Sequence, residues 1–325
     1  MHFVGIDVSK AKLDCLWLKD PDNRKIKTKI HENSAKGHQQ LIGWLDKNIQ
    51  VDRSHIQITL EATGIYHEGL SYALYEAGFK LSVVNPARSK EFAKGLGSQH
   101  KTDRQDSAVL ALFGCRMQPD QWQPEPKEIR ELKGLLARLE ALEGDLRREE
   151  NRLEKSTFNP PSDLVIESLN KMIKELKAEK KRLEKEIDNH IDQYPKLKQD
   201  RQLLESIPGV GPVLSRVMLS VIHSRSFKKA SQVSAYLGLV PVQNESGVFK
   251  GRSRLSKIGP ARVRSKLYMA AVVSSQYNQD IARQKHRLLE NGKSKMQALG
   301  AAMRKLVQIC FGVIKNQTTY CPQVT

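Results

Sequence analysis

The sequence predicts an α/β domain, followed by two long helices and then by a helical, strongly basic segment. Short apolar or alternating runs take turns with amphipathic runs over residues 1–115. From residue 129, apolar residues recur at intervals of three, four or seven, and from residue 201 basic residues far outnumber acidic ones. The 325 residues are enough for two or three domains that each bury a core.

The first segment is expected to be a mixed sheet with helices. The runs expected to form strands cover residues 3–8, 12–18, 25–30, 55–61 and 80–84. The runs expected to form helices cover residues 35–48, 66–77, 88–94 and 103–115. Asn33 and Ser34 introduce the first helix, and Gly78 follows the second at a usual C-cap position. Three strands, a helix and then alternating strands and helices indicate an α/β order with a mixed sheet.

Two long helices are expected next. Apolar positions step along residues 129–153, an Asn-Pro-Pro-Ser break at residues 159–162 interrupts them, and they resume over residues 166–187. This pattern predicts an antiparallel hairpin or a coiled coil. Residues 101–200 contain 20 basic and 21 acidic side chains, which fits a protein–protein contact better than DNA binding. The helices could instead brace the fold, so dimerisation through them is a hypothesis.

The positive charge is concentrated at the end of the chain. Residues 201–325 contain 20 basic and four acidic side chains, a net charge of +16, whereas the whole chain has +18. Such a block indicates a polyanionic partner, because each neutralised phosphate releases condensed counterions. The same segment has an apolar helical pattern, for example at Leu267, Ala270 and Leu299. A folded nucleic-acid-binding domain is therefore predicted rather than a basic tail.

Composition argues against membrane, secreted and zinc-binding proteins. No apolar run approaches the roughly 18 residues of a membrane span. Charged residues such as Asp7 and Lys10 near the start argue against a signal peptide. The four cysteines lie far apart without CxxC spacing, which argues against a zinc site and a disulfide framework. We expect a soluble, reduced, cytoplasmic protein, associated with the nucleoid and with no membrane partner.

Four carboxylates are candidates for a metal site in the first domain. Asp7 and Glu61 come where two strands end, and neighbouring parallel strands end at one edge of a sheet. Asp103 and Asp106 are three residues apart at a helix start, so they share a face. Like charges in one pocket repel unless a cation compensates them, so four converging carboxylates predict Mg²⁺ or Mn²⁺. Two such ions can stabilise the entering and the leaving oxygen of a phosphoryl transfer.

The order of these carboxylates carries more information than any one of them. A pair of aspartates at a helix start is commonly a cap with a solvated face. An Asp on the first strand, a Glu on the strand after the first helix and an Asp-x-x-Asp pair on a late helix are together the arrangement of ribonuclease-H-like (RuvC-like) nucleases. A metal-dependent phosphoryl-transfer site is therefore predicted from Asp7, Glu61, Asp103 and Asp106.

The basic segment contains a candidate phosphate-binding turn. Residues 206–212, with Gly209 and Gly211, lie between two apolar helical runs and resemble a helix-hairpin-helix motif. Glycines permit close backbone approach, and free amides at the next helix start can meet a phosphate. An ordinary glycine-rich turn between helices is the plainer alternative. The basic residues expected to contact phosphates, although solvated basic faces look similar, are Lys250, Arg252, Arg254, Lys257, Arg262, Arg264 and Lys266.

Ser246 stands just before this basic stretch, in the tripeptide Glu-Ser-Gly. Composition does not identify it as reactive, and such a tripeptide is ordinarily a turn. A serine nucleophile needs deprotonation and a positioned phosphorus atom, both of which a cationic, metal-assisted pocket can supply. The sequence alone permits this role without showing it.

Several motifs together resemble the transposase family of insertion sequence 110. They occur in the family's order along nearly the whole chain. The residues that carry the resemblance are 4–10 (Val-Gly-Ile-Asp-Val-Ser-Lys), 61–64 (Glu-Ala-Thr-Gly), 84–86 (Val-Asn-Pro), 101–103 (Lys-Thr-Asp) with Asp106, 206–211 (Ser-Ile-Pro-Gly-Val-Gly), 236–241 (Tyr-Leu-Gly-Leu-Val-Pro), 245–247 (Glu-Ser-Gly) and 256–259 (Ser-Lys-Ile-Gly).

The resemblance implies a RuvC-like domain over residues 1–126, a coiled coil over 127–198 and a transposase domain over 199–325. It implies that Asp7, Glu61, Asp103 and Asp106 hold Mg²⁺, and that Ser246 attacks DNA to form a covalent phosphoserine intermediate. It also implies double-stranded donor and target DNA, a structured noncoding guide (bridge) RNA that pairs with both, and a homo-oligomer that is a tetramer in the synaptic complex. Base pairing would then read the sequence while the protein grips nucleic-acid backbones.

Two other functions remain open from the residues. A structure-specific, junction-resolvase-like endonuclease would use the same carboxylates with water as the nucleophile. A nucleic-acid-binding scaffold with a degenerate nuclease domain would perform no chemistry, but the presence of all four carboxylates counts against it.

Overall fold

The structure, a computed structural model, describes residues 1–20, 25–97, 103–158, 162–242, 245–246, 249–250 and 254–323. For residues 103, 104, 157, 245, 246, 249 and 250 it describes the backbone only. The chain separates into two compact units, Met1–Pro124 and Glu125–Thr325. The predicted division into three domains stays a prediction.

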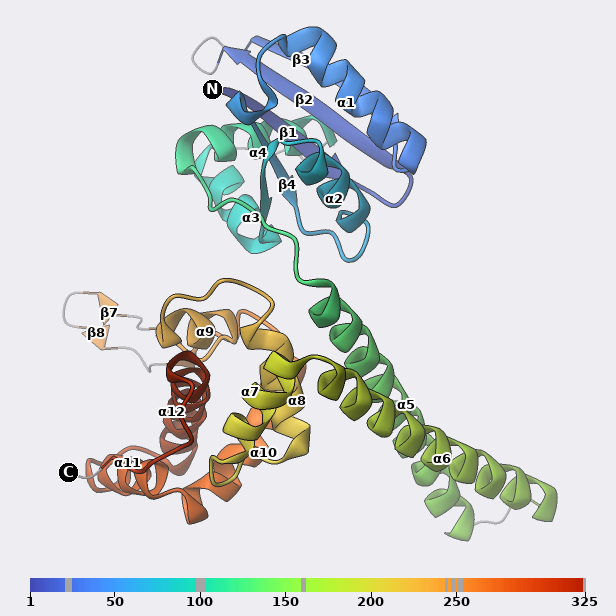
Figure 1. The fold of residues 1–325 in the computed structure, drawn as a ribbon, viewed down its shortest axis with the longest axis vertical. Helices are drawn as coiled ribbons and strands as arrows, with labels where there is room; N and C mark the ends of the chain where they lie inside the picture. Colours follow the sequence, from blue (N-terminus) through green and yellow to red (C-terminus); the bar gives the residue numbers. More distant parts are fainter. Residues whose placement is uncertain are drawn as a thin grey trace. The chain divides into compact units, whose positions relative to one another are not determined.

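The first unit contains a five-stranded mixed sheet (Figure 1). Its strands are β1 (His2–Val8), β2 (Lys12–Asp20), β3 (Lys25–Glu32), β4 (Ile56–Glu61) and β5 (Lys80–Val84). Their order across the sheet is β3-β2-β1-β4-β5. β2 runs antiparallel to both of its neighbours, β1 and β3, whereas β1, β4 and β5 are parallel, so β1, β4 and β5 end at the same edge. The α/β order predicted from the sequence is confirmed.

Helices cover both faces of this sheet. They are α1 (Ala35–Ile49), α2 (Glu68–Glu76), α3 (Pro86–Gly95) and α4 (Asp103–Met117), with a short 3₁₀ helix η1 (Arg53–His55). Apolar side chains that alternate along β1, such as Val4 and Ile6, are fully buried against the layer of α1 and α2. Leu16 of β2 packs on the opposite face with Ala111 of α4. Side chains on the second face of β1 therefore point to the layer of α4.

Two glycines let α4 lie directly on the strands. A Cβ at Gly5 of β1 would overlap the carbonyl oxygen of Ser107 and lie 2.5 Å from the amide nitrogen of Ala111. A Cβ at Gly114 of α4 would overlap the side chain of Thr59 on β4. The backbone of α4 thus lies directly on the backbone of β1 at Gly5, and at Gly114 it lies against the side chain of Thr59 on β4, which fixes the height of this helix above both strands.

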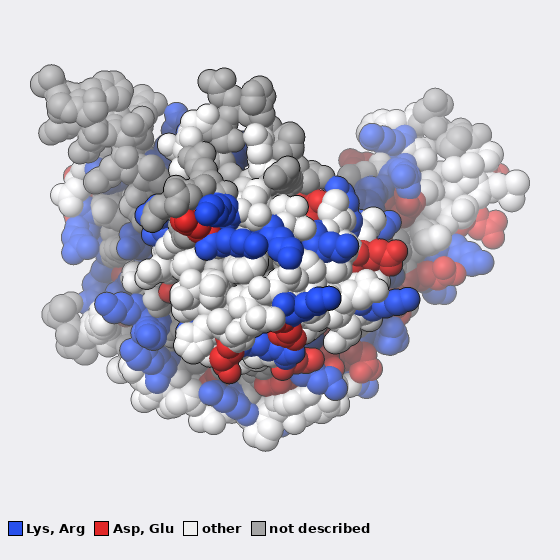
Figure 2. All heavy atoms as spheres, turned by 90° about the horizontal axis from the view of Figure 1, so that it is seen from above, with Lys and Arg blue, Asp and Glu red and all other residues white. Residues whose placement is uncertain are grey.

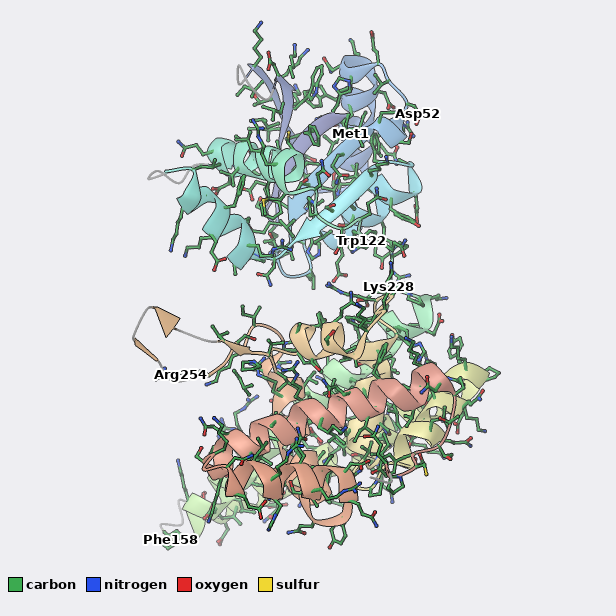
Figure 3. The ribbon with its side chains drawn as sticks, turned by 90° about the vertical axis from the view of Figure 1, so that its left-hand side faces the viewer. Met1, Asp52, Trp122, Phe158, Lys228 and Arg254 are labelled. Carbon is green, nitrogen blue, oxygen red and sulfur yellow. The ribbon has the colours of Figure 1, made fainter. Side chains whose placement is uncertain are left out.

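Several predicted boundaries in this unit were wrong by one or two residues, among them the starts of one helix and one strand. The predicted helix over 66–77 begins at Glu68, because residues 64–67 form a turn in which the amide of Tyr66 donates to the carbonyl of Thr63 (3.0 Å). The strand predicted from residue 55 begins at Ile56, because His55 closes the η1 turn onto Asp52 (2.8 Å). The unit ends where Trp122, labelled in Figure 3, donates its amide to the carbonyl of Leu81 on β5 (2.6 Å).

The second unit begins with a hairpin of two long helices, α5 (Lys127–Phe158) and α6 (Asp163–Gln193). Ion pairs from Lys177 to Glu150 (3.0 Å) and from Lys180 to Glu143 (3.2 Å) show that the helices are antiparallel. The side chain of Ser162 accepts a hydrogen bond from the amide of Val165 and caps α6, as expected after a break in the helix. The predicted pair of long helices is confirmed.

The base of this hairpin belongs to the core of the second unit. Ile129 and Leu132 of α5 and Ile187 and Ile191 of α6 are essentially inaccessible to solvent, and they lie in one apolar cluster with the later helices. The other end of the hairpin exposes large apolar side chains, among them Phe158, labelled in Figure 3. The base of the hairpin is thus buried in the core of the second unit, whereas its tip exposes apolar side chains to solvent.

The rest of the second unit is mostly helical. Its helices are α7 (Pro195–Glu205), α8 (Pro212–Ile222), α9 (Ala230–Tyr236), α10 (Ala261–Tyr277), α11 (Gln279–Glu290) and α12 (Lys295–Asn316). Its strands are β6 (Pro241–Val242), β7 (Glu245–Ser246), β8 (Phe249–Lys250) and β9 (Arg254–Leu255), which form the antiparallel pairs β6–β9 and β7–β8. The described helices include none that is long and apolar enough to cross a membrane.

Candidate catalytic and nucleic-acid-binding sites

Acidic residues form a row on neighbouring strands at one edge of the sheet. Ile6 of β1 pairs with Leu60 of β4 in a parallel register, so the next residues in that register are Asp7 and Glu61. Paired residues of adjacent strands point to the same face, and both carboxylates share the face of Gly5, which touches α4. The structure therefore brings Asp7 and Glu61 side by side at one edge of the sheet, as the sequence predicted.

Glu61 is held by a serine that sequence patterns do not single out. The hydroxyl of Ser89 on α3 donates to Oε2 of Glu61 (2.5 Å) and lies 3.1 Å from the carbonyl of Pro86. Ser89 is buried, so this bond is shielded from water. A serine inside a helix has no distinguishing sequence signal, and only the packing of α3 beside β4 reveals the contact.

The first turn of α4 lies at the level of Asp7. Ser107, the neighbour of Asp106, donates its hydroxyl to the carbonyl of Asp14 (2.8 Å), and Asp14 pairs directly with Asp7 across β1 and β2. Asp106 is half-buried at this position. Asp103 is the first residue of α4, as expected, but its side chain lies outside the described residues. The backbone thus places the start of α4 beside the row of carboxylates.

The donor set fits a hard divalent cation, although the described side chains do not assemble a site by themselves. Carboxylate oxygens are the ligands that Mg²⁺ prefers. Among the side chains that the structure describes, no group of three or more His, Cys, Asp or Glu is arranged so that it could hold a metal ion. The fourth predicted ligand, Asp103, is not among them. The set of four carboxylates as metal ligands stays a prediction.

A third carboxylate and a lysine extend the row. Asp14 lies on the same face as Asp7, because the two residues are paired across the antiparallel strands β1 and β2. Lys12 lies 3.1 Å from the Asp14 carboxylate, whose side chain is only 13% exposed. The alternation along residues 12–18 places Lys12 and Asp14 on one face, so a sequence signal for this pair existed and was missed.

The candidate phosphate-binding turn lies between α7 and α8 and is held by α10. Gly209 has φ of 94°, and a Cβ there would overlap Oγ of Ser274 and lie 2.8 Å from its Cα. Ser274 donates its hydroxyl to the carbonyl of Pro208 (3.1 Å). Gly211, the N-cap of α8, has no side-chain cap, and a Cβ there would meet nothing within 4 Å. The turn therefore presents the start of α8 to open space.

The predicted phosphate-contacting residues have differing surroundings. Arg262 and Lys266 of α10 lie 3.2 and 4.0 Å from the carboxylates of Glu140 and Glu143 on α5. Arg264 donates to the carbonyls of residues 237 (3.3 Å) and 259 (3.0 Å). Arg254 and Lys257 are exposed, and only the backbone of residue 250 is described. Residue 252 lies outside the described residues. All of these contacts with nucleic acid stay predictions.

Ser246 lies in a short antiparallel pair of strands. Its backbone in β7 pairs with Phe249 in β8, and Glu245 pairs with Lys250. Figure 1 shows this pair apart from the helices of its unit. The side chain of Ser246 lies outside the described residues, so the structure supplies the backbone position and no contact of its hydroxyl.

Charge on the molecular surface is mixed. On the face that Figure 2 shows, Lys and Arg side chains are interspersed with Asp and Glu. In the hairpin of the second unit the two signs are paired, for example between Lys180 and Glu143. Residues 201–325 carry a net charge of +16, but acidic side chains of the hairpin neutralise part of it, as in the pair of Arg216 with Asp188 (2.6 Å), so only the remainder is available for a polyanion.

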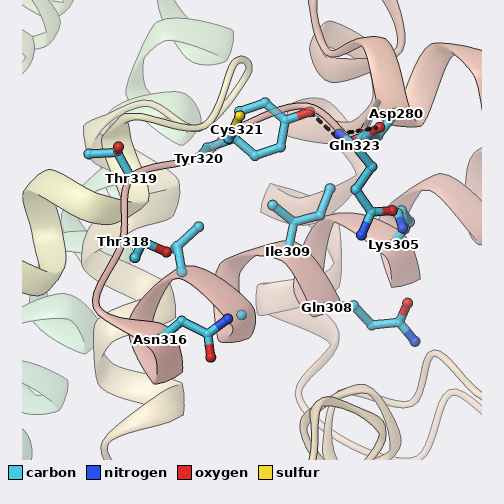
Figure 4. Close-up of a pocket in the computed structure, with 12 residues that line it drawn as sticks. Asp280, Lys305, Gln308, Ile309, Asn316, Thr318, Thr319, Tyr320, Cys321 and Gln323 are labelled. Carbon is cyan, nitrogen blue, oxygen red and sulfur yellow. Dashed lines mark hydrogen bonds between the residues drawn. The ribbon is translucent and has the colours of Figure 1, made fainter. Parts of the chain in front are cut away.

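A pocket of about 370 Å³ lies between α12 and the C-terminal residues (Figure 4). The hydroxyl of Tyr320 lies 2.8 Å from Oδ2 of Asp280, and the amide of Gln323 lies 3.2 Å from Oδ1 of Asp280. Burial, reinforced by the hydrogen bond to Asp280, raises the pKa of Tyr320 to about 12. None of the predicted site residues lines this pocket. These contacts fasten the end of the chain to α11.

Two models of known protein families match this chain. A family model for the DEDD-type transposase domain of IS110 matches residues 4–156. A second model, described as a transposase of the IS116/IS110/IS902 family, matches residues 201–287. Together they cover well over half of the chain. The chain belongs to the IS110 family of transposases. It is accordingly a DNA transposase or recombinase, and its DEDD-type domain indicates the use of a divalent metal.

Relatives of this transposase family match along the whole chain or half of it. Pilin gene-inverting proteins of Moraxella bovis and Moraxella lacunata are each 29% identical over 322 residues, which is 98% of this chain and 97% of theirs. A probable family 20 transposase of Pseudomonas aeruginosa is 28% identical over 174 residues, which is 52% of this chain and 50% of the relative.

Proposed function

We propose that this transposase cleaves and exchanges DNA strands through a covalent phosphoserine intermediate, guided by a structured noncoding RNA. The parallel register that places Asp7 beside Glu61 carries the proposal, because it puts two of the four predicted carboxylates at one sheet edge. The strand order β3-β2-β1-β4-β5, with α4 packed on the central strands, supports a RuvC-like first unit. Strand-exchange and adduct assays with a Ser246 variant test the proposal.

The chain's own residues perform the proposed chemistry in two steps. The oxygen of Ser246 attacks a DNA phosphorus, the new Ser–O–P bond forms, and the bond from phosphorus to the leaving deoxyribose oxygen breaks. The proton of the serine hydroxyl passes to solvent, and the departing oxygen takes up a proton from solvent to become a hydroxyl. A hydroxyl of the exchanged strand then attacks the phosphoserine and releases the serine. Each phosphodiester is thus conserved rather than hydrolysed.

The proposed role of the carboxylates is to hold Mg²⁺ or Mn²⁺. Asp7, Glu61, Asp103 and Asp106 would supply oxygen ligands, and Ser89 would keep one oxygen of Glu61 in place. Bound metal would polarise the scissile phosphate and stabilise charge on the entering and leaving oxygens. We further propose a tetramer in the synaptic complex, in which, as the family resemblance implies, Ser246 acts across protomers.

A structure-specific endonuclease is the competing function. It would use the same carboxylates and would activate water instead of Ser246. The Moraxella relatives are named as gene-inverting proteins, and inversion of a DNA segment requires rejoining as well as cutting. This favours strand exchange. A protein–DNA adduct that survives denaturation would support the serine mechanism, whereas cleavage without any adduct would support hydrolysis.

The proposed partners are donor DNA, target DNA and a guide RNA. The turn between α7 and α8, proposed to be a helix-hairpin-helix, would offer the amides of Gly211 and Val213 to a phosphate. Pro212 has no N–H, and the amides of Leu214 and Ser215 donate to the carbonyl of Gly211. Sequencing of RNA that co-purifies with the protein separates the guided mechanism from a simple nuclease. A discrete structured RNA supports guidance, and random cellular RNA contradicts it.

We expect DNA binding to weaken steeply with salt. Phosphate contacts by the basic second unit would release counterions, and six to ten such contacts cost about 10³–10⁵ in affinity between 50 and 200 mM salt. Equilibrium binding of a duplex, measured at several salt concentrations, gives the slope. A flat response would show that contacts with phosphates do not dominate binding.

The hairpin of α5 and α6 is proposed to act as a coiled coil in self-association. The exposed fractions of Phe158, Leu164 and Met172 near its tip are 87%, 78% and 46%, which leaves apolar surface uncovered in one chain. Removal of the whole hairpin would not test this, because Ile129 and Ile187 at its base belong to the core of the second unit. Substitutions at the tip avoid that problem.

We expect the double variant Leu164→Glu, Met172→Glu to weaken self-association at least about tenfold, since charge would have to be buried in the interface. Sedimentation velocity over a range of protein concentrations measures this, with Lys171→Gln as a control on the same helix. An unchanged oligomer in the double variant would exclude the tip from the interface.

A further inference from the structure

One asparagine connects the two backbone segments that follow the strand-end carboxylates. Asn33 lies between β3 and α1, and its Nδ2 donates to the carbonyl of Ser9 (2.8 Å) and to the carbonyl of Tyr66 (3.0 Å). Ser9 comes two residues after Asp7, and Tyr66 comes five residues after Glu61. A single amide group therefore ties together the segments that leave β1 and β4 at their acidic ends.

The backbone amide and the side-chain oxygen of Asn33 also form hydrogen bonds. Its backbone amide donates to the carbonyl of Ala11 (2.9 Å), and its Oδ1 lies 2.9 Å from Nε2 of His38 on α1. Because Nδ2 faces two carbonyl oxygens, Oδ1 must be the acceptor, so Nε2 of His38 carries the proton. Burial lowers the pKa of His38. The neutral ring in this tautomer, like the protonated ring, donates to Asn33, so the contact holds in either protonation state.

The segment after Glu61 has little packing to hold it. Ile65 and Tyr66 are 73% and 40% exposed, and Gly64 adopts a positive φ of 51°. The amide of Ala62 bonds to the carbonyl of Val84 (3.0 Å), and the amide of Tyr66 closes a local turn onto Thr63. Beyond these backbone bonds, the bond from Asn33 links this segment to the turn after Asp7.

The turn after Asp7 is closed on itself and connected outward through the same residue. The amide and the hydroxyl of Ser9 both donate to the carbonyl of Lys12 (2.9 Å each). Two bonds of Asn33, to the carbonyls of Ser9 and Ala11, fasten this turn to the start of α1. Movement of either acidic strand end would therefore strain the hydrogen bonds of Asn33.

We propose that Asn33 is a positioning residue that fixes the segments after Asp7 and Glu61 relative to each other and so sets how these two carboxylates are presented to a divalent cation. This inference rests on the proposed metal-dependent function of the first unit. Residues that orient metal ligands without touching the metal typically change metal affinity by about 10–100-fold when they are replaced.

The test uses the full-length protein, with Asn33→Ala and the milder Asn33→Ser, which keeps one donor. We expect Asn33→Ala to raise at least tenfold the Mn²⁺ concentration needed for half-maximal DNA cleavage and for Mn²⁺ binding followed by electron paramagnetic resonance. Without metal, amide hydrogen exchange should accelerate over residues 9–12 and 62–67 together. Asn33→Ser should fall between Asn33→Ala and the wild type.

Asn48→Ala is the matched control. Asn48, at the other end of α1, also donates its side-chain amide to a backbone carbonyl, that of Trp44 (2.6 Å), and should leave the Mn²⁺ requirement unchanged. A purely structural role of Asn33 would lower the unfolding temperature and the maximal rate with the metal requirement unchanged, and that result overturns the inference. So does unchanged exchange over either segment.

Failure of the positioning role of Asn33 can be distinguished from failure of the proposed metal-dependent function. If Asp7→Asn kept full cleavage, the metal function of this edge would be wrong, whereas hydrogen exchange would still test the link made by Asn33. If Asp7→Asn were inactive while Asn33→Ala matched the wild type in metal dependence, only the positioning role would be wrong.

Discussion

Replacing Ser246 with alanine is expected to abolish strand exchange and the covalent protein–DNA adduct while leaving nucleic-acid binding intact. The oxygen of Ser246 is the only atom of that side chain that the proposed chemistry uses, so its removal takes away the nucleophile and little else. Loss of a nucleophile typically costs about 10⁴–10⁶ in rate. Binding depends on contacts with phosphates, which this substitution does not alter.

The measurement combines a recombination assay with gel analysis of denatured protein–DNA adducts. Ser265→Ala provides the control, because Ser265 is exposed on α10 and its hydroxyl donates to the carbonyl of Arg262 within the same helix (2.7 Å). Strand exchange at a normal rate by Ser246→Ala would exclude the serine mechanism. Cleavage that persists without an adduct would identify water as the nucleophile.

Asp7→Asn is the second substitution with a large expected effect. Asparagine keeps the size of the side chain and removes the negative charge that a divalent cation requires, in a position beside Glu61 at the end of β1. Metal-assisted charge stabilisation contributes several kcal/mol, so cleavage should fall by about 10³-fold or more. Affinity for DNA should remain the same or rise slightly, because a negative charge is removed from a surface that meets phosphates.

Single-turnover cleavage and duplex binding, measured on the same preparation, separate the two effects. Glu76→Gln is the control, because Glu76 is exposed at the end of α2 in the same unit. Cleavage at the wild-type rate by Asp7→Asn would remove Asp7 from the site. A joint loss of cleavage and of thermal stability would indicate a structural defect instead.

Local features of the fold could be predicted from the sequence because they depend on neighbouring residues. The period-two pattern of β1 and β2, the Ser34 cap of α1 and the Pro-containing break between α5 and α6 each act within a few residues. The adjacency of Asp7 and Glu61 was also predictable, because parallel strands that are neighbours end at one edge.

Contacts between distant elements could not be predicted in the same way. The bond from Ser89 to Glu61 depends on where α3 comes to rest beside β4, and the bonds from Asn33 to Ser9 and Tyr66 depend on the paths of two loops. No periodicity encodes such contacts.

Because α4 lies directly on β1, the two faces of the sheet in the first unit should differ in how well they tolerate substitutions. Apolar exchanges in the layer of α1 and α2, for example at Leu41 or Leu45, can be absorbed by repacking, since flexible side chains surround them. A single methyl group added at Gly5 cannot be accommodated by repacking, because backbone atoms of Ser107 and Ala111 already occupy its place. Such a methyl group would push the start of α4, with Asp103 and Asp106, away from the sheet. DNA cleavage would then be lost through a substitution at a residue that has no functional side chain.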